Sequence, residues 1–176
     1  TRIRDIASEA GVTPAMVHYY FGGARPLLDR VIAERLMPVF GAVREAILGT
    51  ESADPLELAT RFVDAVFAVV ARHPWWPALW VREVLSEGGA LRDLLVKRMA
   101  PDVARGIATR FEQAQARGHL NPRLNPRLVV VTMVGLTLFP MAGAPIWRQL
   151  LDARDLSLDD VRRHAQAVLA AALEVR

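Results

Sequence analysis

Apolar residues recur with a period close to 3.6 along nearly the whole chain, and prolines and glycines divide this pattern into segments. One strand-like run, 128–131, lies inside a longer apolar stretch that fits a helix better. Hydrophobic residues make up 52% of the chain and charged residues 23%, which is typical of a globular protein and excludes wholesale disorder. We therefore predict an all-α fold.

Capping residues and first-turn prolines locate the helix starts. Asp54, Pro55 and Glu57 combine a capping side chain, a first-turn proline and an acidic residue three positions after the cap. Thr13 and Pro14 give a similar signal. We expect helices over 1–10 (capped by Thr1), 14–21, 26–49, 54–73, 74–87, 90–117 (one or two helices), 125–139 and 157–176, with bends near Pro38 and Pro101 and a short helical piece around Trp147.

The residue types needed for most enzyme chemistry are absent or scattered. The chain has no cysteine, which excludes disulfide scaffolds, thiolate metal sites and cysteine nucleophiles. Its four histidines lack the spacing that would place two of them on one helix face, and the Gly22-Gly23 and Gly88-Gly89 pairs look like helix ends rather than phosphate-binding loops. We predict a protein that is not an enzyme and that holds no metal or cofactor.

The stretch from Leu128 to Trp147 contains no charged side chain and is long enough to be weighed as a membrane span. Its helical part before Pro140 is only about 13 residues, or roughly 20 Å at 1.5 Å per residue. A buried helix fits these lengths better, and we expect no membrane association. A helix that is apolar on every side of a small chain suggests that a partner subunit supplies part of its cover.

Residues 1–21 have the pattern of a helix, a tight turn and a second helix. Ile6 and Ala7 on the first helix can face Val17 and Phe21 on the second, and Gly11 suits the left-handed conformation of the turn. From spacing alone, this pattern fits two ordinary packed helices as well as a DNA-binding motif. The charge of residues 1–44, with six arginines and four acidic residues, does not separate the two interpretations.

The order of residues in this segment is more specific than its spacing. The sequence TRIRDIASEAGVT over 1–13, followed by VHYYFG over 17–22, resembles the DNA-binding signature of TetR-family transcriptional regulators. The resemblance implies that Pro14–Tyr20 is a recognition helix that enters the major groove of DNA. It implies contacts to base edges or the adjacent backbone from Arg4, Pro14, Ala15, Met16 and Tyr19. It implies contacts to phosphates from Thr13, His18 and Tyr20, and from the start of the next helix, where Arg25 lies.

Two positions depart from the family pattern. The family usually has a lysine where this chain has Ala24, with Arg25 beside it, and a tyrosine is more common at the position of His18. These departures concern individual phosphate contacts, because histidine can still donate to a phosphate. The family's first helix would precede Thr1, so we expect this sequence to begin inside a domain.

The resemblance also implies a division into a DNA-binding domain, 1–44, and a ligand-binding and dimerisation domain, 45–176. Large apolar side chains with little polar interruption suit a pocket for an apolar or aromatic molecule, and core packing is the alternative explanation for each of them. Glu83 either complements a cationic ligand or pairs with a neighbour such as Arg82. The candidate pocket residues are Phe67, Trp76, Trp80, Phe111 and Met133.

The last helix carries a stripe of apolar residues. Together with the helix over 127–139, it would form half of a four-helix bundle across a two-fold axis, as the resemblance implies. The stripe comprises Val161, Ala165, Val168, Leu169 and Ala172.

These observations lead to one functional hypothesis and one alternative. We expect a cytoplasmic, homodimeric transcriptional repressor that binds double-stranded operator DNA and is released from it by a small apolar or aromatic effector. The alternative is an all-α dimer that binds a small molecule and has no role on DNA.

Overall fold

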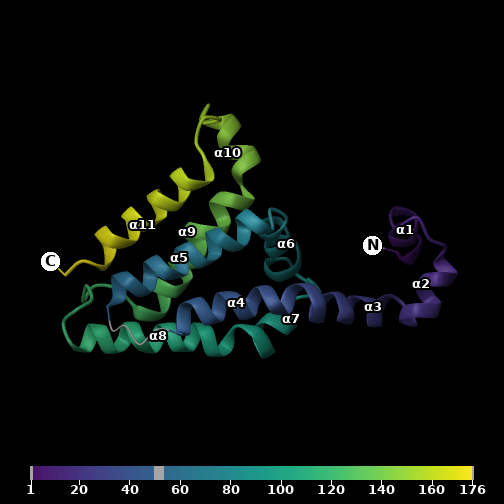
Figure 1. Cartoon of the computed structure of the whole chain (residues 1–176). Coiled ribbons are helices and arrows are strands. Elements are labelled where there is room, and N and C mark those ends of the chain that lie inside the picture. The colour runs from purple at the N-terminus through teal and green to yellow at the C-terminus, as the bar shows by residue number, and fades with distance from the viewer. Residues whose placement is uncertain (1, 50–53, 176) are drawn as a thin grey trace. The chain divides into compact units, whose positions relative to one another are not determined.

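The computed structural model describes residues 2–49 and 54–175, except for the side chains of residues 98 and 99. Within these ranges every regular element is a helix and no β-strand occurs, which confirms the predicted all-α fold (Figure 1). The chain forms two compact units, Thr1–Gly41 and Ala42–Arg176, and the division between them falls within one helix.

The first unit contains three short helices and the start of a fourth. Its elements are α1 (Ile3–Glu9), α2 (Pro14–Phe21), α3 (Ala24–Val31), the π-helical segment η1 (Ile32–Leu36) and the first residues of α4 (Met37–Leu48). The helix expected from Pro26 begins two residues earlier, directly after Gly23. The bend was expected near Pro38, but the irregular part of this helix is the π-helical segment η1, which precedes Pro38. Its widened turn ends where the Met37 N–H donates to the carbonyl of Ile32.

The second unit is built from the end of α4 and the remaining helices. These are α5 (Pro55–Arg72), α6 (Trp76–Trp80), η2 (Val81–Leu85), α7 (Arg92–Leu94), η3 (Leu95–Met99), α8 (Pro101–Ala116), α9 (Pro126–Ala142), α10 (Ala144–Leu150) and α11 (Leu158–Leu173). The predicted break before Pro101 is present. The helix expected over 74–87 starts later and ends at Leu85.

Side-chain caps start the long helices where the sequence predicts them. The Asp54 carboxylate accepts from the Leu56 N–H at 2.9 Å, and the Ser157 hydroxyl accepts from the Asp160 N–H at 3.1 Å. The predicted cap of the first helix, Thr1, lies outside the described residues. Helix α1 begins after Arg2, whose own N–H donates to the Asp5 carboxylate at 3.0 Å.

Pro140 does not end α9, contrary to the expectation from the sequence. The helix continues to Ala142, where Gly143 is its C-cap. Pro140 lies in the last turn, so its missing N–H removes a single hydrogen bond near the end of the helix. The carbonyl of Pro140 also accepts a hydrogen bond from the indole Nε1–H of Trp147 at 2.7 Å, which ties α9 to α10.

The core of the second unit lies where α5, α8, α9 and α11 pack on one another. Its largest fully buried side chains are Phe111, Ile47, Ile107, Leu120, Met133, Leu169 and Val63. At the edge of this core, Asp64 on α5 accepts from the Arg162 guanidinium at 2.8 Å and from the Gln166 amide at 2.9 Å. These two bonds fix the position of α11 against α5.

Among the described residues, no single helix is both long and apolar enough to cross a membrane. Helices α9 and α10 pass such a test only when taken together, and the bend between them is 73°.

Candidate nucleic-acid interface

The first unit is organised around the turn between α1 and α2. Gly11 has a positive φ of 65°, which is the left-handed conformation that favours glycine, and the Val12 N–H donates to the carbonyl of Ala7 at 2.9 Å. The two helices pack on each other, and their buried side chains are Ala7 on α1 and Val17 on α2. The sequence predicts this arrangement, although Phe21 is only half-buried.

Both ends of α2 are fixed by local hydrogen bonds. The Thr13 hydroxyl oxygen accepts from the Met16 N–H at 3.3 Å, and Pro14 occupies the first turn. At the other end, Gly22 adopts a φ of 75°, and its N–H donates to the His18 carbonyl at 2.8 Å. Helix α2 is therefore a short rod with defined limits.

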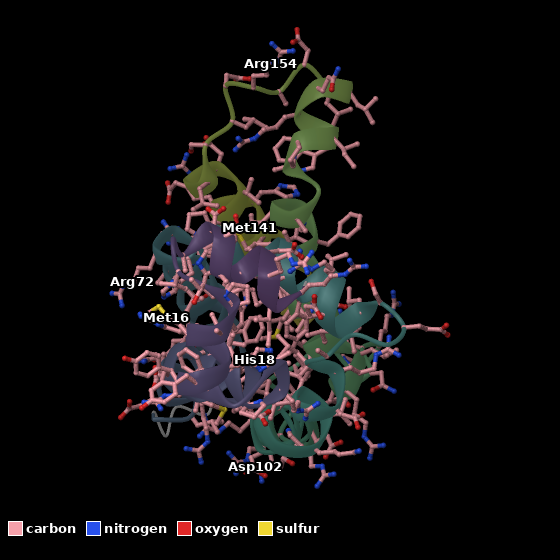
Figure 2. All side chains as sticks on the ribbon, turned by 90° about the vertical axis from the view of Figure 1, so that its right-hand side faces the viewer. Met16, His18, Arg72, Asp102, Met141 and Arg154 are labelled. Carbon is pink, nitrogen blue, oxygen red and sulfur yellow. The ribbon has the colours of Figure 1, made fainter. Side chains whose placement is uncertain are left out.

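The outer side of α2 is open to solvent. Tyr19 is 84% exposed, whereas Val17 on the opposite side is 5% exposed. The Tyr19 and Tyr20 rings contact each other edge to face, with their centroids 5.2 Å apart. The residues that the resemblance assigns to DNA contacts on this helix are all exposed, and two of them are labelled in Figure 2: Pro14, Ala15, Met16, His18, Tyr19 and Tyr20.

The two arginines assigned to DNA contacts differ in their surroundings. Arg4 is exposed on α1, and the described part of the chain shows no ion pair for it. Arg25 lies in the first turn of α3, where its Nε is 3.3 Å from the Asp29 carboxylate. Both partners of that ion pair are well exposed, so it is weak and a phosphate can compete for Arg25.

The candidate pocket residues lie on four helices of the second unit, α5, α6, α8 and α9. Phe67, Trp76, Phe111 and Met133 are buried, and Trp80 is half-buried. Burial agrees with a pocket wall and with ordinary core packing alike, so the assignment of these residues to a ligand stays a prediction.

Glu83 pairs with its neighbour rather than standing free. Its carboxylate accepts from the Arg82 Nε–H at 2.8 Å and from the Ala90 N–H at 3.2 Å. The hydrogen bond from Arg82, followed by the one from Ala90, lowers the pKa of Glu83. Of the two interpretations of Glu83 from the sequence, the structure shows the pairing with Arg82.

Helix α9 has one buried and one exposed apolar side. Met133 lies fully buried, whereas Val131 is 64% exposed and Phe139 is 74% exposed. Leu128 belongs to the same exposed side, because 128, 131, 135 and 139 follow each other at intervals of three and four. Sequence reasoning identified the helix but not which of its sides is open, although this spacing carries the signal.

The apolar stripe expected to mediate dimerisation on the last helix faces mainly inward. Ala165 and Leu169 are buried against the rest of the same unit, because α11 packs on α5 and α9. Val168 belongs to the predicted stripe but is exposed, and Val161 and Ala172 are half-buried. The buried stripe therefore belongs to the core of the chain, and the open side of α11 runs through Val168.

No group of three or more histidine, aspartate or glutamate side chains suited to a metal ion occurs among the described residues.

Comparisons with known proteins agree with this architecture. A family model described as the tetracyclin repressor-like, C-terminal domain matches residues 55–172, about two thirds of the chain. A crystal structure described as a TetR-family transcriptional regulator from Rhodococcus sp. superposes with a TM-score of 0.67 at 25% sequence identity, covering 99% of this chain and 88% of that one. No curated protein matches the sequence.

Proposed function

The chain belongs to the TetR family of transcriptional regulators, and from this premise we propose that it is a homodimeric repressor whose operator binding is relieved by a small apolar or aromatic molecule. Ligand-responsive, DNA-binding regulation of transcription is the function of the family. We place DNA binding in residues 1–44, and ligand binding and dimerisation in residues 45–176. A role on chromosomal DNA makes a cytoplasmic location part of the same proposal.

The observation that carries the proposal is the two-sided character of α2. Val17 is buried on one side of the helix, and Tyr19 on the opposite side is open to solvent. A helix of this kind fits the major groove, where each base pair presents a distinct pattern of donors and acceptors. We propose that Pro14, Ala15, Met16 and Tyr19 face the base edges or the adjacent backbone.

Contacts to phosphates would orient this helix on the duplex. Thr13, His18 and Tyr20 flank the outer side of α2, and Arg4 and Arg25 add positive charge from the helices before and after it. The start of α3, with free backbone N–H groups after Gly23, offers a further phosphate site. Ala24 cannot make the charged contact of the family's usual lysine, so Arg25 is the nearest substitute.

We propose that the exposed sides of α9 and α11 form the dimer interface. A stripe of large apolar residues that a monomer leaves in water is the usual mark of a subunit interface. Val131 and Phe139 on α9 and Val168 on α11 supply it here. Two copies of these helices would form a four-helix bundle, and the two α2 helices would then meet successive major grooves about 34–36 Å apart.

Release from DNA requires a ligand that prefers a different spacing of the two recognition helices. The equilibrium shifts by no more than the difference between the ligand's affinities for the two states. The aromatic set around Phe67, Trp76 and Phe111 is our candidate for the effector-binding region, because apolar and aromatic walls suit an apolar ligand.

A mobility-shift assay with the intact protein and the DNA upstream of its own coding region tests the proposal. We expect a complex that survives an excess of unrelated duplex, with a footprint of two half-sites. Equal binding to both duplexes, or no complex at all, would favour the alternative of an all-α small-molecule-binding dimer without a role on DNA.

A further inference from the structure

A cleft of about 290 Å³ lies in the second unit, and Phe67, Trp76 and Phe111 of the aromatic set described above are not among its lining residues. The end of α5, the start of α6, the end of α9, α10 and the start of α11 form its walls. Most of its lining is apolar, with Val70, Pro140, Met141 and Leu158 among the contributors. Arg148 is the one charged side chain in the wall, and no carboxylate faces it there.

Arg148 is held in place from two directions. Its Nη2 donates to the carbonyl of Leu156 at 2.8 Å, and its guanidinium carbon lies 5.5 Å from the centre of the Trp147 ring, in the range of a cation–π contact. Trp147 is itself fixed by its hydrogen bond to Pro140. The guanidinium is therefore positioned before any ligand arrives, which reduces the cost of ordering it on binding.

The hydrogen-bonding capacity of this guanidinium is not used up by the protein. Its Nε is buried and has no acceptor among the described residues. The described part of the chain also shows no carboxylate within ion-pair distance of Arg148, whereas Arg162 and Arg163 on the neighbouring helix are both paired. A half-buried cation without a counter-charge, in an apolar wall, favours an anionic group beside it.

We propose that this cleft binds a small organic carboxylate with an apolar body. The carboxylate would accept hydrogen bonds from the Arg148 guanidinium, and the apolar part would lie against Val70, Met141 and Leu158. The planar fork of arginine matches a carboxylate better than it matches a neutral polar group. The inference does not rest on DNA binding or on the effector region proposed above.

Calorimetric titration of the intact protein with octanoate, in the absence of DNA, tests the inference. Octanamide is the matched neutral ligand, since it has the same chain and shape without the charge. We expect saturable binding of octanoate and at least tenfold weaker binding of octanamide. Failure of octanoate to saturate the protein, or equal affinities for the two ligands, overturns the proposal.

Two variants and a control locate the site. R148Q removes the charge and is expected to weaken octanoate binding at least tenfold. R154Q removes a charge from the exposed connection between α10 and α11, whose tip Arg154 marks in Figure 2, and is expected to leave binding unchanged. Equal effects of R148Q and R154Q contradict the assignment.

A second variant keeps the test decisive if R148Q fails to fold, because Arg148 also ties α10 to Leu156. A71W places a large side chain in the cleft from an exposed position near the end of α5 and leaves Arg148 intact. With its circular dichroism spectrum and melting temperature preserved, A71W is expected to lose octanoate binding. Undiminished binding by folded A71W would overturn the proposal.

Discussion

The hydroxyl oxygen of Thr13 accepts a hydrogen bond from the backbone N–H of Met16 at the first turn of α2. The Met16 N–H also donates to the backbone carbonyl of Thr13 at 3.0 Å, so the side chain and the backbone of Thr13 share this N–H in the first turn, where helix N–H groups lack partners one turn earlier. The same residue that starts the helix is also expected to contact a phosphate. If Thr13 contacts a phosphate as we propose, one side chain links the stability of α2 to its position on DNA.

T13A should lower the free energy of unfolding of the first unit by about 1 kcal/mol, the usual cost of losing a side-chain cap. Urea denaturation followed by circular dichroism, together with hydrogen exchange at the Met16 amide, measures the effect. T13S keeps the acceptor oxygen and is the matched control. If T13A and T13S protect the Met16 amide equally, the cap contributes nothing to α2.

R4A should weaken operator binding and reduce its dependence on salt. Arg4 is exposed and shows no ion pair in the described part of the chain, so its full charge is available to a phosphate. Loss of one such contact lowers the slope of log K against log salt concentration by about 0.9. Fluorescence anisotropy over a series of salt concentrations gives the slope. R25A is the comparison variant, and we expect a smaller change in its slope because Arg25 already pairs with Asp29. If the slope of R4A equals that of the wild type, Arg4 does not belong to the interface.

V131E should dissociate the proposed dimer. A carboxylate on the exposed apolar side of α9 would have to be buried without a partner when two subunits meet, which costs several kcal/mol. Sedimentation velocity should show monomers at concentrations where the wild type is dimeric. The matched control is V96E, since Val96 on η3 is 61% exposed and Val131 64%. Dimers that persist in V131E, or dissociation that is equal in V96E, would contradict the proposed interface.

E83Q should make stability less dependent on pH. The pKa of Glu83 is lowered in the folded protein from its ordinary value of 4.5, so the ionised form stabilises the fold above that value. The contribution is lost as the pH falls through the lowered pKa. The free energy of unfolding of the wild type should exceed that of E83Q by about 0.5 kcal/mol at pH 7, which is the usual contribution of a partly exposed ion pair. This difference should vanish in acid.

Chemical denaturation at several pH values measures this difference. E87Q, at an exposed position four residues along the chain, is the control. If the free energies of unfolding of wild type and E83Q differ by the same amount at every pH in the acid range, the Arg82–Glu83 pair does not stabilise the fold.

Local signals in the sequence were enough to predict most helices. Caps such as Asp54 and Ser157 act within three residues of themselves, so they can be identified without knowledge of the fold. The turn at Gly11 and the exposed side of α2 are local in the same sense. Pro140 is the counter-example, because α9 continues past it to Ala142 and has Gly143 as its C-cap.

Features that depend on distant packing were not predicted. The stripe through Ala165 and Leu169 looks the same whether it faces a partner or the chain's own core, and only the packing of α11 against α5 and α9 separates the two. Arg148 likewise has no distinguishing neighbour in the sequence. Its unmatched charge becomes visible once five helices enclose the cleft.

The ability of α2 to read DNA sequence is tested most directly by comparing the specificity of wild type and Y19A. Anisotropy titrations at fixed salt would give, for each protein, the ratio of affinities for the operator and for a scrambled duplex. Our account predicts a high ratio for the wild type and a loss of about 1–3 kcal/mol of that discrimination in Y19A, with non-specific binding little changed. An unchanged ratio in Y19A, in a protein that binds the operator specifically, would contradict it.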